Sequence, residues 1–263
     1  GVMQSRTDPD PIAYTSAVRV RRRIGYQLWR LVANVITRVA CRAERRGMDS
    51  MPPGPWIMVG AHISHFDSLM VIGASPRKLD AVMAAELYDN PWLSRIIRSM
   101  DGLPFMRSEQ PGELRDGGAL RKLDRVAYLR MKDRLARGRI ILVSPEGGIR
   151  TGAQSVLEGG PWPSGTAALA IRCGVPIRPC LSLGADQLYV RRRWLRGVRL
   201  IHWLGEPVWP NPQLRGVEQR EEMMRRCGDQ LRGMYQRVLA EHPEADDLVP
   251  RTAQERWRQA GLL

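Results

Sequence analysis

The sequence predicts an α/β protein, with a mixed, largely parallel sheet flanked by helices and an N-terminal amphipathic helical segment before it. Three observations support this prediction. Apolar runs of strand length alternate with stretches of helical length from Trp56 onward, which is typical of α/β domains. Apolar residues before that point recur at helical spacing. A chain of 263 residues, 43% of them apolar, is long enough to bury the core of one large domain.

The expected elements follow each other along the chain in a regular order. The predicted strands are residues 56–60, 81–85, 103–106, 139–144, 175–182 and 198–204. The predicted helices are residues 68–73, 91–100, 118–137, 164–173 and 216–241, with a short last helix near 253–259. A proline-rich turn at 51–55 ends the N-terminal segment. We therefore expect a basic membrane-docking segment over 1–50, the main domain over 51–245 and a C-terminal tail over 246–263.

The first segment combines an apolar stripe with a large positive charge. The stripe, at helical spacing, consists of Ile24, Leu28, Leu31, Val35 and Val39, with Val32 and Ile36 beside them. Between Arg19 and Arg46 there are nine arginines and one acid, Glu44, within a chain whose net charge is +14. This pattern predicts a basic amphipathic helix lying in an anionic membrane surface. The alternative is an ordinary amphipathic helix whose stripe packs on the protein's own core.

Composition excludes several classes of protein. The longest apolar runs span only a few residues, so no membrane-spanning helix is expected. Four cysteines without a C-x-x-C pair predict neither a disulfide scaffold nor a zinc site. No nucleic-acid-binding motif accompanies the arginines. A non-enzymatic module that binds an anionic membrane or nucleic acid through arginine stays open as an alternative.

A histidine and an aspartate follow the first strand of the main domain. His62 lies just beyond the carboxyl end of strand 56–60, where α/β folds place their sites, and Asp67 comes shortly after it. On a turn leading into a helix, the carboxylate can accept a hydrogen bond from one ring nitrogen and leave the other free. Such an imidazole can take a proton from a hydroxyl group. The alternative is that Asp67 only caps the following helix.

Three further sequence blocks follow that pair. They are Gly102-Leu-Pro-Phe105-Met-Arg107, Ser144-Pro-Glu146-Gly147-Gly148-Ile-Arg150 and Val175-Pro176-Ile-Arg-Pro179. Together with the His62 and Asp67 block, in this order and spacing, they resemble the four blocks of the glycerolipid acyltransferase family. That family includes the 1-acyl-glycerol-3-phosphate and other lysophospholipid acyltransferases. The resemblance covers about residues 56–182 and is specific, because all four blocks are present in order.

The resemblance implies a glycerol-3-phosphate acyltransferase-like fold and an O-acyltransferase of phospholipid biosynthesis. His62 would be the general base and Asp67 would orient it, while a hydroxyl attacks the thioester of acyl-CoA or acyl-carrier protein without an acyl-enzyme. The implied acceptor is the lysophospholipid 1-acyl-glycerol-3-phosphate (lysophosphatidic acid), which would give phosphatidic acid. The substrate-binding residues would be Gly102, Phe105, Arg107, Glu146, Gly147, Gly148, Arg150, Pro176 and Pro179. Among these, Arg107 would bind the acceptor phosphate and Arg150 could add a second positive charge.

The resemblance implies no cofactor or metal, and His62 with His65 lacks a third ligand cluster nearby. The implied partners are the lipid acceptor, the acyl donor and an anionic membrane surface, with no nucleic acid. A second basic cluster, within 191–199, could meet an acidic carrier protein or a CoA phosphate. We expect a peripheral, monotopic protein on the cytoplasmic face of the membrane, because no secretory signal is visible.

Two departures from the family pattern concern the acceptor. The third block of the family continues with Thr-Arg after Glu-Gly, whereas here Gly148 and Ile149 precede Arg150, so the arginine is displaced by one position. The first block has asparagine before its histidine in the family and Ala61 here. These departures leave a second hypothesis open, in which the same fold and mechanism acylate another lipid or alcohol, such as a glycolipid or an amino-acid-derived lipid.

Overall fold

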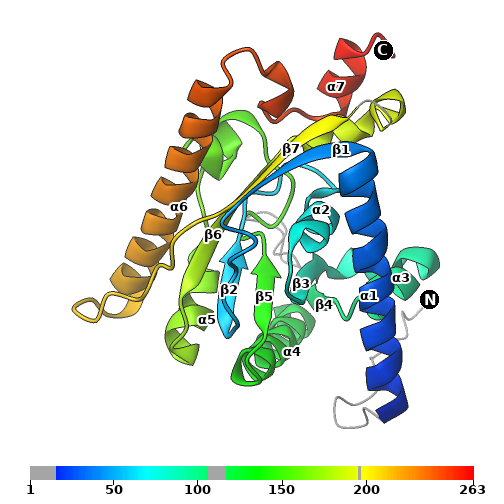
Figure 1. Ribbon diagram of the computed structural model, residues 1–263. Coiled ribbons are helices and arrows are strands. Elements are labelled where there is room, and N and C mark those ends of the chain that lie inside the picture. The colour runs from blue at the N-terminus through cyan, green and yellow to red at the C-terminus, as the bar shows by residue number, and fades with distance from the viewer. Residues whose placement is uncertain (1–15, 106–116, 195–196) are drawn as a thin grey trace.

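The computed structural model describes the backbone of residues 16–105, 117–194 and 197–263 (Figure 1). Within these residues, seven strands form one sheet in the order β1-β7-β6-β2-β5-β3-β4. The strands are β1 (Cys41–Arg46), β2 (Trp56–Val59), β3 (Leu79–Ala84), β4 (Leu103–Phe105), β5 (Ile140–Val143), β6 (Ile177–Leu183) and β7 (Val198–Leu204). The α-helices are α1 (Ser16–Val39), α2 (Asp67–Ala74), α3 (Pro91–Ser99), α4 (Gly117–Ala136), α5 (Gly165–Cys173), α6 (Gly216–Glu241) and α7 (Ala253–Gln259).

Neighbouring strands of this sheet are parallel except β6 and β7, which run antiparallel. The register places Met58 of β2 opposite Leu142 of β5, and Leu142 opposite Ala81 of β3. The central parallel strands therefore end at a common carboxyl edge, which is where parallel α/β sheets place their sites. The predicted fold class, a mixed and largely parallel sheet flanked by helices, is confirmed.

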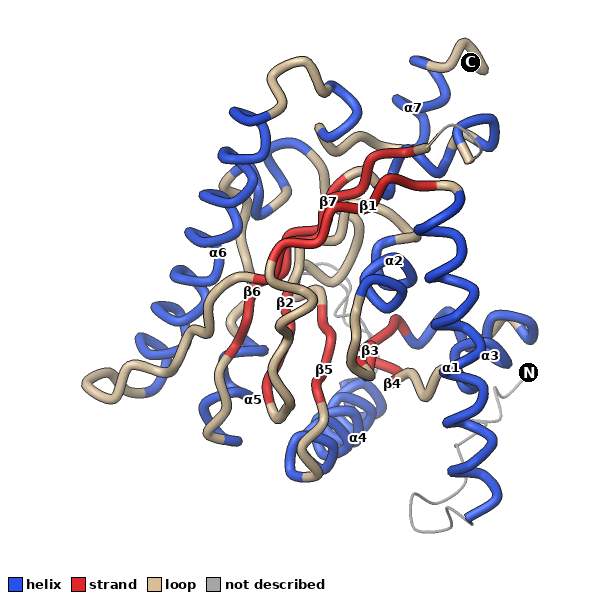
Figure 2. Tube along the Cα trace, viewed as in Figure 1, coloured by secondary structure: helices blue, strands red, loops and turns tan. Residues whose placement is uncertain are grey.

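Helices cover both faces of the sheet (Figures 1 and 2). Successive residues of β2 point to opposite faces, as the pleat of a strand requires. Trp56 and Met58 join the core cluster that contains residues of α1 and α2. Ile57 and Val59 join the cluster that contains residues of α4, α5 and α6. β2 is thus buried on both sides and forms a firm support for the loop that follows it.

Residues 41–46 form a strand that the sequence did not predict, since we expected them within the docking segment 1–50. β1 pairs in parallel with β7 along its whole length. It is the outermost strand of the sheet, and only its first residue, Cys41, is buried. A strand at an edge needs few apolar side chains, and charged residues there discourage pairing with other chains. The expected docking segment therefore contributes a strand to the sheet of the main domain.

α1 packs on the rest of the protein through the face opposite its apolar stripe. Tyr26 and Ala33 are buried on this inner face. A Cβ at Gly73 of α2 would lie 2.9 Å from the Cβ of Ala33, and one at Gly25 would lie 2.8 Å from the carbonyl oxygen of Ser99 in α3. Because glycine lacks a Cβ, α1 can approach both helices closely, and its orientation on the protein is fixed.

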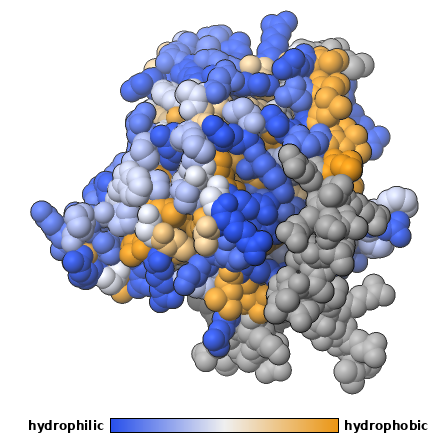
Figure 3. Space-filling model, turned by 60° about the horizontal axis from the view of Figure 1, so that its bottom comes forward, coloured by the Kyte–Doolittle hydropathy of each residue, from blue (hydrophilic) through white to orange (hydrophobic). Residues whose placement is uncertain are grey.

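The apolar stripe of α1 faces outward. Its exposed members are Ile24 (64%), Leu28 (57%), Leu31 (61%), Val32 (37%), Val35 (51%) and Val39 (73%). Figure 3 shows apolar surface along the side of the molecule where α1 lies. The alternative that this stripe packs on the protein's own core is therefore wrong, although Ile36 at its border does contact a core cluster. In the part of the chain that the structure describes, no helix combines the length and apolarity needed to cross a bilayer.

The C-terminal tail contains the short helix that the sequence predicted near 253–259. Thr252 caps α7, and Glu255 completes a capping box with it. α7 packs on the 3₁₀ helix η4 (Ala185–Tyr189), which follows β6. Figure 1 shows α7 at the same end of the molecule as the β1–β7 pair. The tail is thus folded against the main domain.

Candidate active site

His62 and Asp67 meet in the loop that joins β2 to α2, which we call the histidine loop (residues 60–66). The Nδ1 atom of His62 lies 3.1 Å from Oδ2 of Asp67. The Asp67 side chain is 7% exposed and that of His62 is 21% exposed, so the imidazole is the member of the pair that solvent or a substrate can reach. With Nδ1 donating to the carboxylate, Nε2 carries the free lone pair.

The carboxylate of Asp67 is held from several directions. The backbone N–H groups of Ile63 and Ser64 donate to Oδ2 at 2.7 and 2.8 Å. The Ser64 hydroxyl donates to Oδ1 at 2.8 Å. Asp67 is the first residue of α2, and the N-cap position is occupied by Phe66, which makes no capping hydrogen bond. The Asp67 carboxylate bonds to N–H groups of the preceding loop and does not cap the helix. The capping alternative is therefore wrong.

Ser64 is a site residue that the motifs in the sequence did not identify. Its side chain is wholly buried, and its Oγ also accepts a hydrogen bond from the N–H of Phe66. A serine two residues after the histidine and three before the aspartate is the signal that could have found it, since serine often bonds to nearby backbone groups in turns.

The third sequence block braces the peptide groups on both sides of His62. Oε2 of Glu146 accepts the backbone N–H of His62 at 2.8 Å, and the carbonyl oxygen of His62 accepts the N–H of Arg150 at 2.8 Å. Oε1 of Glu146 accepts the N–H of Val156 at 2.8 Å. Burial raises the pKa of Glu146, while the N–H donors of His62 and Val156 lower it. Glu146 thus positions the imidazole from a distant part of the chain.

The remaining residues of the third block differ in exposure. Gly147 has a φ of +68°, which glycine adopts without strain, and Gly148 is buried. The side chain of Arg150 is exposed and has no hydrogen-bond or ion-pair partner among the described residues. The backbone of Arg150 is bonded to that of His62, and its exposed guanidinium is available to an anion.

The second block reaches the same edge of the sheet. Leu103 pairs with Val82, so Phe105 of β4 extends to the carboxyl edge, and its side chain is 36% exposed. A Cβ at Gly102 would lie 2.6 Å from Cγ2 of Ile97, so Gly102 permits close packing against α3. Arg107, which we expected to bind the acceptor phosphate, lies outside the described residues.

Of the two prolines of the fourth block, Pro179 lies within β6 and Pro176 immediately precedes it. Pro179 is opposite Val59, near the carboxyl end of β2 and close to the histidine loop. Pro176 precedes β6, and its carbonyl oxygen accepts the N–H of Ile57 at 3.1 Å. The structure therefore brings Pro179, but not Pro176, toward the end of the sheet that carries His62.

Among the described residues, no group of three or more His, Cys, Asp or Glu side chains is arranged to hold a metal ion. His65 contacts a tyrosine instead, with its Nδ1 atom 2.8 Å from Oη of Tyr189. His202 lies within β7, is wholly buried, and has its Nδ1 atom 3.1 Å from the hydroxyl of Ser182. His62, by contrast, has an accessible imidazole that lies at hydrogen-bond distance from a buried carboxylate. The remaining histidine, His242, lies 4.0 Å from the exposed carboxylate of Glu244, just after α6.

Comparison with known proteins gives a family match and a structural match. A family model described as Acyltransferase matches residues 42–182, which is more than half of the chain. The crystal structure of the 1-acyl-sn-glycerophosphate (LPA) acyltransferase PlsC from Thermotoga maritima is similar, with a TM-score of 0.58 over 85% of this chain and 84% of that chain. The two sequences are 17% identical, so the likeness concerns the fold. A search of curated proteins finds no match.

Proposed function

This chain belongs to the acyltransferase family, and we propose that it acylates lysophosphatidic acid to phosphatidic acid, using the thioester of acyl-CoA or acyl-carrier protein. The observation that carries the proposal is the hydrogen-bonded pair of His62 and Asp67, exposed on the imidazole side and buried on the carboxylate side. The likeness of the fold to the Thermotoga maritima enzyme supports the same class of reaction.

In the proposed reaction, Nε2 of His62 removes the proton from the acceptor hydroxyl as its oxygen attacks the thioester carbonyl. Asp67 accepts the Nδ1 proton, which keeps the lone pair on Nε2 and stabilises the imidazolium that forms. The tetrahedral intermediate then expels the thiolate, which receives the proton from His62. The ester bond forms, the thioester bond breaks, and the imidazole returns to its neutral form.

The proposed acceptor carries a phosphate, for which Arg150 is the described candidate. Its guanidinium is exposed, and its backbone is tied to His62. A guanidinium can offer two parallel N–H donors to phosphate oxygens. The displacement of this arginine by one position keeps the second hypothesis in view, in which a glycolipid or an amino-acid-derived lipid is the acceptor.

The proposed acceptor and product are membrane lipids, so we place the protein peripherally on an anionic membrane surface, at its cytoplasmic face. The exposed stripe of α1 supports this placement, since its side chains could enter the interface between headgroups and acyl chains. Arg38, which is exposed in the last turn of α1, would then approach lipid phosphates.

The donor would be acyl-CoA or acyl-carrier protein. Arg191 and Arg192, in the 3₁₀ helix η5 (Arg191–Arg193), are exposed and positively charged. This surface suits either the phosphates of CoA or an acidic carrier protein. Parallel assays with the two donors would choose between them.

The test is to incubate the protein with an acyl thioester and a panel of acceptors, and to identify the products by mass spectrometry. We expect phosphatidic acid from lysophosphatidic acid, and little product from phosphate-free acceptors. Product from a glycolipid or an amino-acid-derived lipid alone would replace the acceptor, and no acyl ester with any acceptor would overturn the proposed activity.

A further inference from the structure

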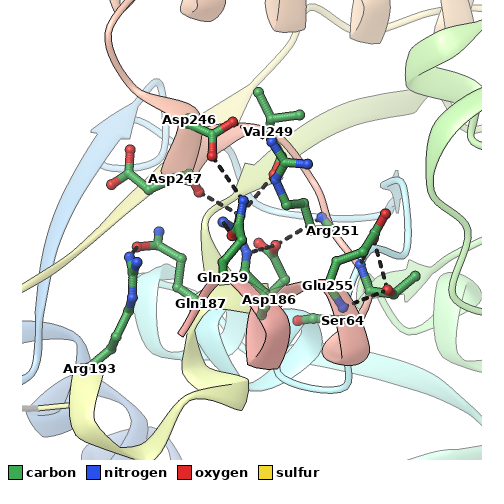
Figure 4. A network of polar contacts seen from close by, with 12 residues as sticks. Ser64, Asp186, Gln187, Arg193, Asp246, Asp247, Val249, Arg251, Glu255 and Gln259 are labelled. Atoms are coloured by element: carbon green, nitrogen blue, oxygen red, sulfur yellow. Dashed lines mark hydrogen bonds and ion pairs between the residues drawn. The ribbon is translucent and has the colours of Figure 1, made fainter. Parts of the chain in front are cut away.

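A buried ion pair joins the segment after β6 to the C-terminal helix (Figure 4). Nε of Arg256 donates to Oδ2 of Asp186 at 2.7 Å, and the same oxygen accepts the N–H of Arg251 at 3.0 Å. The side chains of Asp186 and Arg256 are 0% and 2% exposed. Arg256 also donates to the carbonyl oxygens of Asp247 and Val249, so it fixes the tail as well as the pair. This set of contacts anchors η4 to α7.

The last residue of η4, Tyr189, connects this anchor to the histidine loop. The Tyr189 hydroxyl oxygen accepts the backbone N–H of His65 at 3.1 Å and lies 2.8 Å from Nδ1 of that residue. The ring of Phe66 meets the ring of Tyr189 edge-on, with 5.6 Å between centroids. On the other side, Nε1 of Trp257 donates to the carbonyl oxygen of Tyr189 at 3.0 Å. Tyr189 therefore contacts the loop and α7 at once.

Asp186 also lies near the site itself. Burial raises the pKa of Asp186 to about 6, Arg256 lowers it, and the carboxylate of Asp67 adds a repulsion that raises it. The positive charge of Arg256 thus offsets part of the cost of keeping a negative charge on Asp186. A buried ion pair adds little net stability compared with apolar packing, but removing one partner leaves an uncompensated charge. The pair is thus better suited to fixing geometry than to stabilising the fold.

The contacts just described come from beyond the part of the chain that matches the acyltransferase family, which ends at residue 182. They act on His65 and Phe66, which lie between the proposed base and its aspartate. A shift of the loop by a fraction of an ångström would move Nε2 of His62 relative to the acceptor hydroxyl, and proton transfer depends on that distance.

We propose that Tyr189 and Arg256 are positioning residues for the acyl transfer, which hold the histidine loop in place through the His65 peptide and the Asp186 ion pair. This inference rests on the proposed function for its effect on rate, but the effect on the loop is independent of it. Neither side chain touches the reacting atoms; each acts through the loop.

The test uses the full chain with Tyr189→Phe, and with Tyr128→Phe of α4 as the matched control. Hydrogen–deuterium exchange reports the loop directly. Without the hydroxyl, the His65 N–H loses its acceptor, so exchange in peptides covering 62–66 should rise about 10-fold while other peptides are unchanged. In the assay, kcat should fall about 10-fold with KM and Tm unchanged, whereas the control should match the wild type.

Arg256 is tested by rescue. Arg256→Met should lower kcat and speed exchange in the same loop, and Arg256→Lys should restore both in part, because it keeps the charge beside Asp186. If Arg256→Met does not fold, Tyr189→Phe decides alone. Unchanged exchange in the loop of Tyr189→Phe would overturn the inference, and so would faster exchange with an unchanged kcat. If the wild type itself transfers no acyl group, the proposed function fails, while the exchange data still show whether Tyr189 holds the loop.

Discussion

The Asp67 carboxylate depends on three donors besides His62, and they differ in what they contribute. The backbone N–H groups of Ile63 and Ser64 hold Oδ2, which also faces the imidazole, whereas the Ser64 hydroxyl holds only Oδ1. Each hydrogen bond to a charged group of this kind contributes about 1.5–3 kcal/mol. We therefore expect that substitution of Asp67 lowers kcat more than substitution of any one residue that donates to its carboxylate.

Asp67→Asn should lower kcat by about 10³-fold, because an amide cannot hold Nδ1 of His62 in the tautomer that leaves Nε2 free. Steady-state kinetics with lysophosphatidic acid measure this. Asp133→Asn, at an exposed ion pair of α4, is the control and should behave as the wild type. Equal kcat for Asp67→Asn and the control would show that the pair has no part in the reaction.

Ser64→Ala should have a smaller effect. It removes the donor to Oδ1 and leaves the backbone donors to Oδ2 in place, so we expect a loss of about 10-fold in kcat and about 2 kcal/mol in the free energy of unfolding. Assays and urea denaturation measure the two. A loss of kcat as large as that of Asp67→Asn would contradict this ranking.

Arg150→Gln tests the acceptor phosphate. Loss of a charge-assisted contact should raise KM for lysophosphatidic acid at least about 10-fold. A phosphate-free acceptor should be used equally well by both proteins. Arg137→Gln, at an exposed pair on α4, is the matched control. An unchanged KM for lysophosphatidic acid would separate Arg150 from the phosphate and favour another acceptor.

At the scale of elements, α1 shows how a helix can be fixed to a domain and still present an apolar face to its surroundings. Its inner face carries Tyr26, whose hydroxyl accepts the N–H of Leu79, and Trp29, whose Nε1 donates to the Ser99 hydroxyl at 2.9 Å. The periodicity in the sequence located the stripe correctly. It could not say which face of the helix would be covered, because both faces carry apolar residues.

Leu31→Glu and Val35→Glu should each weaken binding to anionic vesicles by about 10-fold or more, since each replaces an exposed apolar side chain that could enter the interface. The Tm should not change, because neither side chain is buried. Vesicle co-sedimentation measures the binding. Val217→Glu, at an equally exposed position of α6, is the control. Identical binding by all variants would argue against docking through α1.

β1 could not be predicted from the pattern of apolar residues. In Cys41–Arg46 most residues are charged, so no apolar alternation distinguishes this strand from its basic surroundings. Its pairing is set by backbone hydrogen bonds to β7, which begins more than 150 residues later in the chain. Pairing between strands this far apart in the sequence depends on the whole fold. For the same reason the brace from Glu146 to His62, between residues 84 positions apart, could not be derived from local spacing.

In the whole molecule, the four sequence blocks lie on or next to strands of a single sheet, namely β2, β4, β5 and β6. The strand lengths and the alternation with helices were predictable from the sequence, as was the family. The order β6-β2-β5-β3 and the antiparallel β7 were not, because they depend on how the layers of helices pack. The pairing of His62 with Asp67 was predictable, since His62 lies in a short loop and Asp67 is the first residue of the helix that follows it.

The buried histidine of β7 makes folding stability depend on pH. Burial, together with the nearby positive charge of Arg45, lowers the pKa of His202 from an ordinary value of 6.5 to about 4. The neutral form is therefore favoured in the folded state, so its contribution to stability is present above pH 6.5 and is lost as the pH falls toward 4. Linkage gives a loss of about 2 kcal/mol between pH 7 and pH 5.

His202→Gln should reduce this dependence on pH, because the side chain no longer titrates. Urea denaturation at pH 5, 6 and 7 measures the free energy of unfolding of both proteins. We expect the wild type to lose about 2 kcal/mol more than the variant between pH 7 and pH 5. Parallel losses in the two proteins would show that His202 does not stay neutral in the folded state.

The central claim is that the imidazole of His62 takes the proton from the acceptor hydroxyl. The most direct measurement is the rate of acyl transfer from an acyl thioester to lysophosphatidic acid by the wild type, by His62→Ala and by His242→Ala, a histidine outside the site. We expect a loss of about 10²–10⁴-fold in kcat for His62→Ala alone. Equal rates for all three proteins, with each one folded, would contradict it.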